Sequence, residues 1–375
     1  MKRQLTIQNI YRIYINKRFS IDFKMGFLPS FSLFIFFISF IFFSNICVAQ
    51  DIHLSHIHAS PTYYNPAMTA VFNGDLRLIG NYRGQWNTIT KGYKSLIASG
   101  DMKLNAGIGL RDNIGVGFQA ISDKAGDLDF TNMSFGIALS YLKALNDDGD
   151  HIISMGIHNG IVQNRLNISK IRIFEQDPFL SSSDFINHVN YWDLSAGIAW
   201  FYPMWKEDYI YLGGSVFHLN KAFAGFSDGR VESKSGSFLT PKYVLHGGGS
   251  FQLSHFTTLI PNFIMVDQFP HREFLMGSFL KITPEPRTYL QPEYAFYGGL
   301  WVRWSYKDGH FTKDALVASV RYDYMNMIYS ISFDINISNL AKANSGFGGP
   351  ELSIIKYFDF NRPERMRTRV KCPDM

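Results

Sequence analysis

Apolar and polar positions alternate along the stretch that follows residue 75. One face carries apolar or aromatic side chains and glycines, and the other is mainly polar: Leu76, Leu78, Gly80, Tyr82, Gly84 and Trp86 against Arg77, Ile79, Asn81, Arg83 and Gln85. A two-residue period is typical of a β-strand with two different faces, and half-buried strands of soluble sheets have it too. The length, roughly 9–11 residues, and the aromatic end favour a membrane-spanning strand with lipid outside and a polar lumen inside.

The same alternation returns along the rest of the chain. It is clearest in residues 94–104, 114–120, 131–141, 153–158, 192–202, 296–307 and 329–338. Three weaker segments fit with either face towards lipid, namely 209–220, 256–267 and 352–360. Together they predict an all-β protein, a closed antiparallel transmembrane β-barrel of about 14 strands over residues 76–360.

The composition agrees with a barrel. Hydrophobic residues make up 46% of the 375 residues, aromatic residues 16% and charged residues only 18%. This aromatic content is high for a soluble enzyme, whereas a mean hydropathy of −0.06 is too polar for a bundle of membrane helices. Outer-membrane barrels lie between these classes, because each strand exposes only half of its side chains to lipid.

Residues 1–49 have the pattern of a signal peptide. A long basic region precedes an apolar run over residues 27–48, and Cys47-Val48-Ala49 places small residues before a cleavage site at Gln50. A retained membrane anchor is the alternative, since the apolar run is nearly long enough to span a bilayer. We expect cleavage.

Without residues 1–49 the chain has a formal net charge of zero. Of the 36 Lys and Arg and the 31 Asp and Glu, residues 1–49 contain six and one, which leaves 30 of each. The basic balance of the whole chain therefore does not indicate nucleic-acid binding. Cys372 is the sole cysteine beyond Cys47, so no disulfide within the mature chain is expected.

Residues 361–375 form a basic tail. Its positive side chains are Arg362, Arg365, Arg367, Arg369 and Lys371. Because both ends of an even-stranded barrel lie on the periplasmic side, we expect this tail in the periplasm. It either binds an acidic partner there or stays solvated.

Residues 50–75 precede the first strand and are predicted to form a periplasmic arm. Pro61 and Pro66 exclude a regular helix or strand, and Asn65-Pro66-Ala67 reads as a fixed turn that leads into the barrel. His53, His56 and His58 are spaced like metal ligands, but a site needs more ligands and a supporting shell. We predict a polar arm packed against or into the barrel, with no metal and no cofactor.

Charged residues also fall on the predicted lumen face. The main ones are Arg77, Asp193, Arg303, Arg321 and Asp334. Mixed charges inside a barrel usually pair with one another, and a substrate pathway is the alternative. Catalytic motifs such as G-x-S-x-G, H-E-x-x-H and a Walker loop are absent from the sequence, and Ser215, His218, His246 and Ser250 are scattered. We therefore predict that the protein is not an enzyme.

Several motifs carry a family resemblance. A-x-P-x-x-x-NPA and NYR-x-QW lie within residues 50–86, and further matches lie at 114–127, 211–220, 329–340 and 348–354. In this order they resemble the PorP/SprF family of type IX secretion and gliding. The shared motif residues are Asn65, Pro66, Ala67, Asn81, Tyr82, Arg83 and Trp86. Ala70 stands where the family often has Gly, and His56 and His58 replace more usual Gln and aromatic residues.

The resemblance implies a place and a role. It implies an integral outer-membrane protein that receives or anchors a secreted, adhesin-like surface protein, without enzymatic activity. Its partners would be that client, periplasmic and outer-membrane secretion components, and membrane lipid. The residues alone support only a barrel without chemistry. The alternative function is therefore an outer-membrane pore or transporter for small hydrophobic or polar solutes.

Overall fold

A computed structural model describes most of the chain after residue 53. The described residues are 54–55, 57–85, 92–104, 112–126, 129–146, 151–167, 186–205, 208–226, 238–284, 294–307, 310–338, 341 and 346–360. The predicted signal peptide, Trp86, His53, His56 and the basic tail lie outside the described residues.

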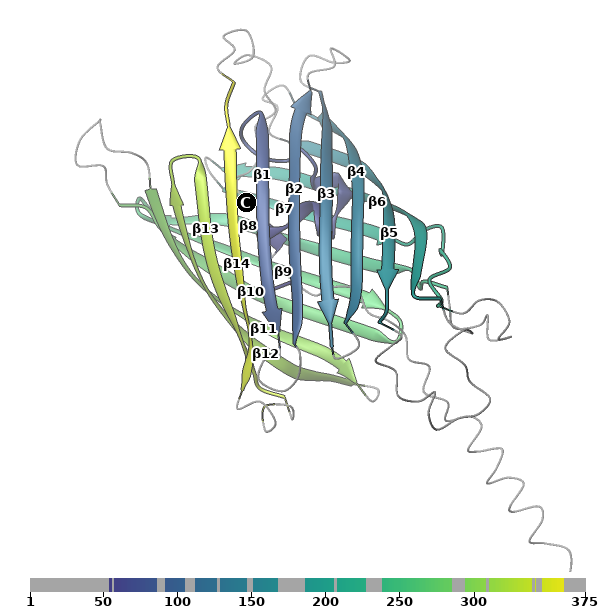
Figure 1. The fold of residues 1–375 in the computed structure, drawn as a ribbon. Coiled ribbons are helices and arrows are strands. Elements are labelled where there is room, and N and C mark those ends of the chain that lie inside the picture. The colour runs from purple at the N-terminus through teal and green to yellow at the C-terminus, as the bar shows by residue number, and fades with distance from the viewer. Residues whose placement is uncertain are drawn as a thin grey trace, which may run out of the picture. The chain divides into compact units, whose positions relative to one another are not determined.

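The described part of the chain forms fourteen antiparallel strands that close into one barrel (Figure 1). They are β1 (Leu76–Gln85), β2 (Tyr93–Leu104), β3 (Asn113–Ala125), β4 (Phe130–Ala144), β5 (Ile152–Arg165), β6 (His188–Trp205), β7 (Asp208–Phe217), β8 (Lys242–Ser254), β9 (Thr257–Gln268), β10 (His271–Ile282), β11 (Tyr294–Lys307), β12 (His310–Tyr324), β13 (Met327–Asn336) and β14 (Phe347–Phe358). Each strand pairs with its neighbour in sequence, and β1 pairs with β14 to close the ring. The predicted fold class is confirmed.

The strand faces follow the alternation in the sequence. In β1, Leu78 and Tyr82 are exposed outwards, and Arg77, Asn81 and Arg83 are buried inside. The strands whose facing the sequence left open also take one orientation. Inward-facing, buried residues include Tyr209 and Tyr211 in β7, Ile260 and Ile264 in β9, and Glu351 and Ile355 in β14.

The two ends of the barrel differ in their connections. Leu76 pairs with Phe358, so β1 begins and β14 finishes at the same end, which we call the terminal end. The longest connections, residues 166–187 and 218–241, join strands at the opposite end. Bacterial outer-membrane barrels have short periplasmic turns and longer extracellular loops. The opposite end therefore has the character of an extracellular end.

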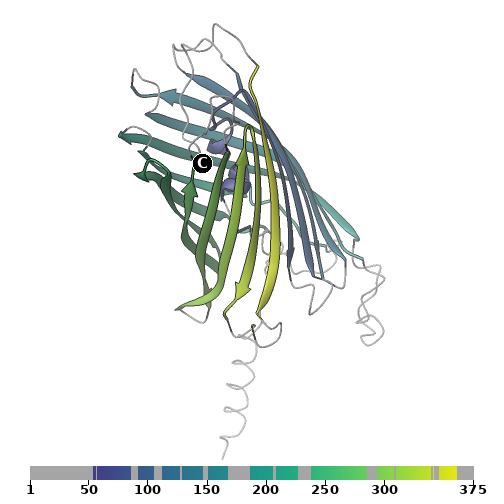
Figure 2. The same cartoon turned by 90° about the vertical axis from the view of Figure 1, so that its left-hand side faces the viewer.

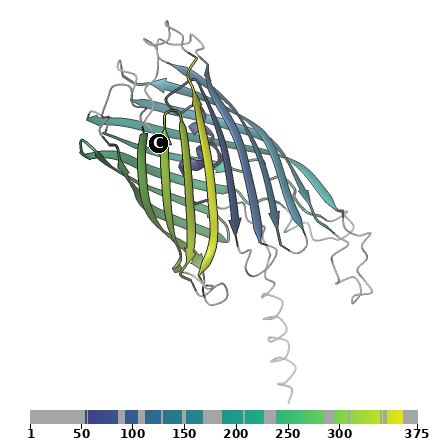
Figure 3. The same ribbon diagram turned by 60° about the vertical axis from the view of Figure 1, so that its left-hand side comes forward.

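The N-terminal arm lies inside the barrel (Figures 2 and 3). It contains three short helical turns, η1 (Ile57–Ala59), α3 (Pro61–Tyr64) and η2 (Pro66–Met68), and every residue from 59 to 72 is buried. The sequence predicted an arm packed against or into the barrel, and the described residues of the arm lie in the lumen. The reason is physical: these side chains are mostly apolar and gain cover from water only between the barrel walls. Among the described residues, no helix is long and apolar enough to cross a membrane.

The barrel interior contains apolar cores rather than a uniformly polar lumen. In one, Leu54, Tyr63 and Tyr64 of the arm pack with wall residues that include Phe279 and Trp301. Another joins arm and wall residues, including Met68, Val71, Leu142, Ile152 and Phe201. The arm supplies the apolar partners that let such large side chains point inwards.

Candidate functional site

The Asn65-Pro66-Ala67 turn is the point where the arm is held most closely. The Asn65 side-chain oxygen accepts a hydrogen bond from the Ala67 amide at 2.9 Å, which caps η2. Its side-chain nitrogen donates to the Ile198 carbonyl at 3.0 Å and lies 3.0 Å from Nε2 of His246. Pro66 has no N–H to satisfy at the start of η2. One asparagine thus both shapes the turn and fastens it to the wall.

Serine hydroxyls from the wall bind the carbonyls of the arm. Ser140 donates to Thr69 O at 2.7 Å, Ser154 to Ala67 O at 2.7 Å, and Ser215 to Tyr64 O at 2.6 Å. A buried carbonyl without a partner is costly, so an irregular segment can lie in the lumen only when the wall satisfies its backbone.

Small residues line the wall beneath the turn. They occupy one register row across β3 to β7, in the order Gly115, Ser140, Gly156, Gly197 and Ser215. A β-carbon at Gly156 would lie 2.5 Å from the Ala67 nitrogen, and one at Gly115 would lie 2.7 Å from the Ala70 β-carbon. The row therefore forms a shallow seat in which the backbone of the arm lies directly on the sheet. We call these five residues the small-residue row.

Arg77 joins the end of the arm to the first two strands. Its guanidinium bonds both oxygens of Asp101, at 2.9 and 2.7 Å, and also donates to Met68 O at 3.2 Å. Asp101 accepts the Ala70 amide at 2.7 Å. Ala70 has a φ of 61°, in the left-handed region that favours glycine.

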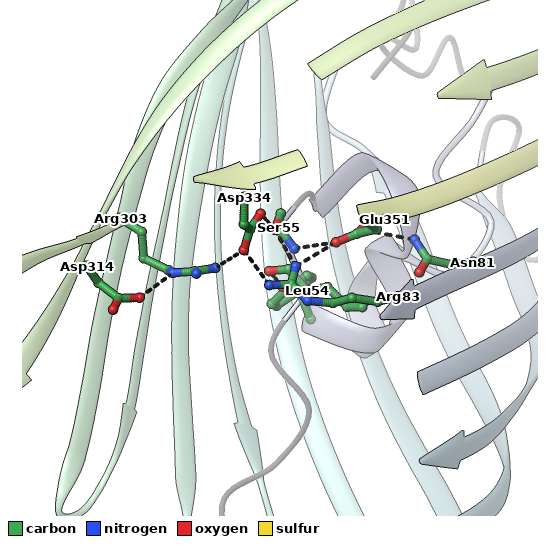
Figure 4. A network of polar contacts seen from close by, with 9 residues as sticks. Leu54, Ser55, Asn81, Arg83, Arg303, Asp314, Asp334 and Glu351 are labelled. Carbon is green, nitrogen blue, oxygen red and sulfur yellow. Dashed lines mark hydrogen bonds and ion pairs between the residues drawn. The ribbon is translucent and has the colours of Figure 1, made fainter. Parts of the chain in front are cut away.

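Arg83 is the centre of a second buried network (Figure 4). It contacts Asp334 at 2.5 Å and Glu351 at 2.8 Å, and the three residues are between 1% and 3% exposed. Ser55 of the arm joins both carboxylates: its amide donates to Glu351 and its hydroxyl to Asp334, each at 2.8 Å. Asn81 donates to the other oxygen of Glu351 at 3.0 Å.

A second arginine extends this network along the wall. Arg303 contacts Asp334 at 2.9 Å and Asp314 at 2.9 Å. Two arginines thus face three carboxylates, which compensates most of the buried charge.

The other candidate lumen charges form separate pairs. Asp193 contacts Nδ1 of His218 at 2.8 Å, and Arg321 contacts Asp323 at 2.7 Å while lying over the Tyr297 ring. Of the five lumen charges that the sequence indicated, the structure joins Arg303 with Asp334 and places Arg77, Asp193 and Arg321 elsewhere on the inner wall. Tyr82 of the shared motif points outwards and is 37% exposed.

The scattered serines and histidines do not assemble into a catalytic group. Ser215 binds the arm, His218 contacts Asp193, and His246 contacts Asn65. Ser250 is buried on β8. His58 lies beside the rings of Phe279 and Trp301, and no group of metal-ligating residues occurs among the described residues.

Sequence reasoning missed much of the seat for the arm. Ser55, Ser140, Ser154 and Glu351 were not singled out, nor were the inward-facing glycines. For the wall residues a signal did exist, because Ser140, Ser154, Glu351 and the glycines occupy inward-facing positions of their strands. Recognising the small-residue row needs the register of five strands, which the sequence alone does not show.

The fold and the inner site define a class of protein: an outer-membrane β-barrel whose lumen holds the N-terminal arm of its own chain. Residues 46–348 match the family described as type IX secretion system membrane protein PorP/SprF, and the chain belongs to that family. Membership implies partners within the type IX secretion system. A search of curated proteins finds no match.

Solved structures of outer-membrane barrels are similar at low identity. One is the CymD monoaromatic hydrocarbon channel, with 10% identity over 81% of this chain and 94% of that chain, at a TM-score of 0.46. A FadL homologue from Pseudomonas aeruginosa has 11% identity over the same shares, at a TM-score of 0.45. BamA from Haemophilus ducreyi has 8% identity over 75% of this chain and 69% of that chain, at a TM-score of 0.40.

Proposed function

We propose that this barrel is a non-enzymatic outer-membrane accessory of type IX secretion and gliding, which receives or anchors a secreted, adhesin-like surface protein. The observation that carries the proposal is the arm in the lumen. A segment of the chain occupies the space through which a solute would have to pass. Family membership links the barrel to type IX secretion. An arm in the lumen favours a scaffold over a channel for solutes.

The contacts of the arm favour its stable position in the lumen. Residues of the arm belong to two apolar cores, its carbonyls accept hydrogen bonds from wall hydroxyls, and Ser55 is bonded to two carboxylates. Moving it out would expose these apolar side chains and leave buried polar groups of the wall without partners. The charges that the sequence placed in the lumen are paired in the described residues, as expected of a structural interior.

The decisive experiment is a gene deletion in the native cell. In the deletion strain, the cognate type IX surface protein should fail to reach the cell surface or be lost to the medium. The wild-type gene should restore it. If the surface protein still reaches the surface and stays there without the barrel, the proposal is wrong.

A conductance measurement separates the proposal from the pore alternative. The purified barrel in a planar lipid bilayer should show no steady ion conductance, because the arm fills the lumen. Steady open channels from the wild-type protein would contradict the scaffold proposal and support a pore for small solutes.

A further inference from the structure

Three cationic side chains lie in one register row on the outer face of the barrel. Lys94 of β2 is directly opposite Lys124 of β3. Lys124 is opposite Thr131 of β4, which in turn is opposite Arg165 of β5. The three cations are exposed and have the outward parity of their strands. Neighbouring strands are about 4.8 Å apart, so three spacings extend over about 14 Å. We call Lys94, Lys124 and Arg165 the cationic row.

The cationic row has no counter-charge within the described part of the chain. Lys94 and Lys124 are like charges directly opposite each other, an arrangement that destabilises a sheet. The neighbouring Asp123 accepts a hydrogen bond from Ser95 inside the barrel, and Asp129 lies in the turn beyond the row. The other described arginines all form ion pairs: Arg77, Arg83, Arg272, Arg303 and Arg321. An anion from outside the chain would therefore neutralise the row.

The height of the row indicates where this anion comes from. The row lies at the opposite end of the barrel, which has the character of an extracellular end, at the bottom of β2 to β5 in Figure 1. Outward residues nearer the terminal end are mainly large and apolar, among them Leu96, Phe135 and Ile161. They belong to the band that acyl chains cover in an outer-membrane barrel. A lipid on this band has its headgroup at the height of the row, which the long Lys and Arg side chains can reach.

Other described strands at this end carry a different pattern. On β10 the outward Arg272 is paired with Asp267 at 2.9 Å and lies over the ring of Tyr306. On β12 the exposed Lys313 is opposite Trp304 of β11 and not opposite a second cation. Adjacent cations without a counter-charge thus mark one sector of the wall, β2 to β5, and do not form a belt around the described barrel.

We propose that the cationic row binds the phosphate groups of an anionic lipid in the outer leaflet of the outer membrane. Phosphate oxygens match the planar fork of donors on Arg165, and the two lysines act as point charges. The bound headgroup offsets the repulsion between Lys94 and Lys124. It also assigns the β2–β5 sector to lipid, so a membrane-embedded partner binds elsewhere on the wall. The inference does not depend on the proposed client-binding role.

Titration with a phosphate-bearing lipid tests the site. The probe is dimyristoyl phosphatidic acid, added to the purified barrel in dodecyl maltoside, and the readout is the thermal midpoint of heat-modifiable gel migration. The wild type should be stabilised in a saturable way. Each Lys or Arg at an anionic surface contributes a factor of about five in affinity, so Lys124→Gln should weaken binding about fivefold. Adding Lys94→Gln and Arg165→Gln should bring the loss to about 100-fold. Lys313→Gln is the matched control and should bind like the wild type.

Two further measurements separate binding from folding. Without lipid, the triple glutamine variant should be at least as stable as the wild type, because its substituted side chains are exposed and their repulsion is gone. A charge-retaining variant with Lys94→Arg, Lys124→Arg and Arg165→Lys should keep the binding. Equal affinity of the wild type and the triple glutamine variant would overturn the proposal, as would an equal loss in Lys313→Gln. Equal stabilisation by inorganic phosphate would also overturn it, since the site would then take free phosphate and not lipid.

Discussion

A β-carbon added to Gly197 would overlap the side-chain oxygen of Asn65, so the wall is open at the point where the arm turns. That oxygen also caps η2 by accepting the Ala67 amide. Glycine at position 197 of β6 therefore leaves the space that the Asn65 side chain needs to cap η2. A change at Gly197 acts on a residue that is more than a hundred positions away in the sequence.

Gly197→Ala should destabilise the folded barrel by about 1–3 kcal/mol, the usual cost of overpacking a close contact. Gly298→Ala on β11 is a matched control, because a β-carbon there would meet nothing within 4 Å. Denaturant midpoints from heat-modifiable gel migration in detergent would measure both. Equal midpoints for the two variants would show that the arm does not depend on this contact.

Ser154→Ala should lower the free energy of unfolding by about 1–3 kcal/mol, because it leaves the buried Ala67 carbonyl without its donor. Ser195→Ala is the matched control. The Ser195 hydroxyl is fully buried and, among the described residues, makes no hydrogen bond. Its removal should be neutral or slightly stabilising in the same denaturation assay. A larger loss for Ser195→Ala than for Ser154→Ala would contradict the role of the wall serines.

The strands and their facing could be predicted because alternation is a local property. Leu78 and Arg77 differ in environment for a reason visible within one strand. The enclosed arm could not be predicted in this way. Its residues have no period, and the hydrogen bond from Ser55 to Glu351 joins positions 296 residues apart.

Trp301 illustrates the same limit. It faces inwards and is 1% exposed, although a polar lumen should disfavour such a side chain. The arm and neighbouring aromatic residues give it apolar cover, with the Phe279 ring centroid 4.6 Å away. The prediction of a polar interior was incomplete because it left out the segment that fills the interior.

Arg83→Met should destabilise the barrel by about 3–5 kcal/mol, because it leaves the buried carboxylates of Asp334 and Glu351 without their main counter-charge. Arg272→Met is the control. Its ion pair with Asp267 involves an arginine side chain that is 44% exposed, so the expected loss is about 0–1 kcal/mol. Urea titrations of the two detergent-purified variants would provide the comparison. Similar losses would mean that the Arg83 network contributes no more than a surface pair.

Ala70→Gly should stabilise the barrel by up to about 1 kcal/mol, since glycine adopts a φ of 61° without the strain of a β-carbon. Ala70→Val should destabilise, because a β-branched side chain disfavours this conformation and the site lies against Gly115. Thermal midpoints of the three proteins should rise in the order Val, Ala, Gly. A lower midpoint for glycine than for alanine would contradict the strain argument.

Truncation after Phe360 should leave the barrel intact and weaken its binding to periplasmic secretion components. The β1–β14 seam finishes at Phe358, and the Phe360 amide donates to Asp75 at 2.7 Å, so the folded contacts at this end are retained. The removed tail has five basic residues against two acidic ones. An attraction of this kind is screened by salt, over about 8 Å at physiological ionic strength. Co-purification from detergent extracts at rising salt would measure this attraction.

A full-length control with glutamine in place of Arg362, Arg365, Arg367, Arg369 and Lys371 separates charge from chain length. If the truncated barrel co-purifies as well as the wild type at low salt, the tail is a solvated end without a partner.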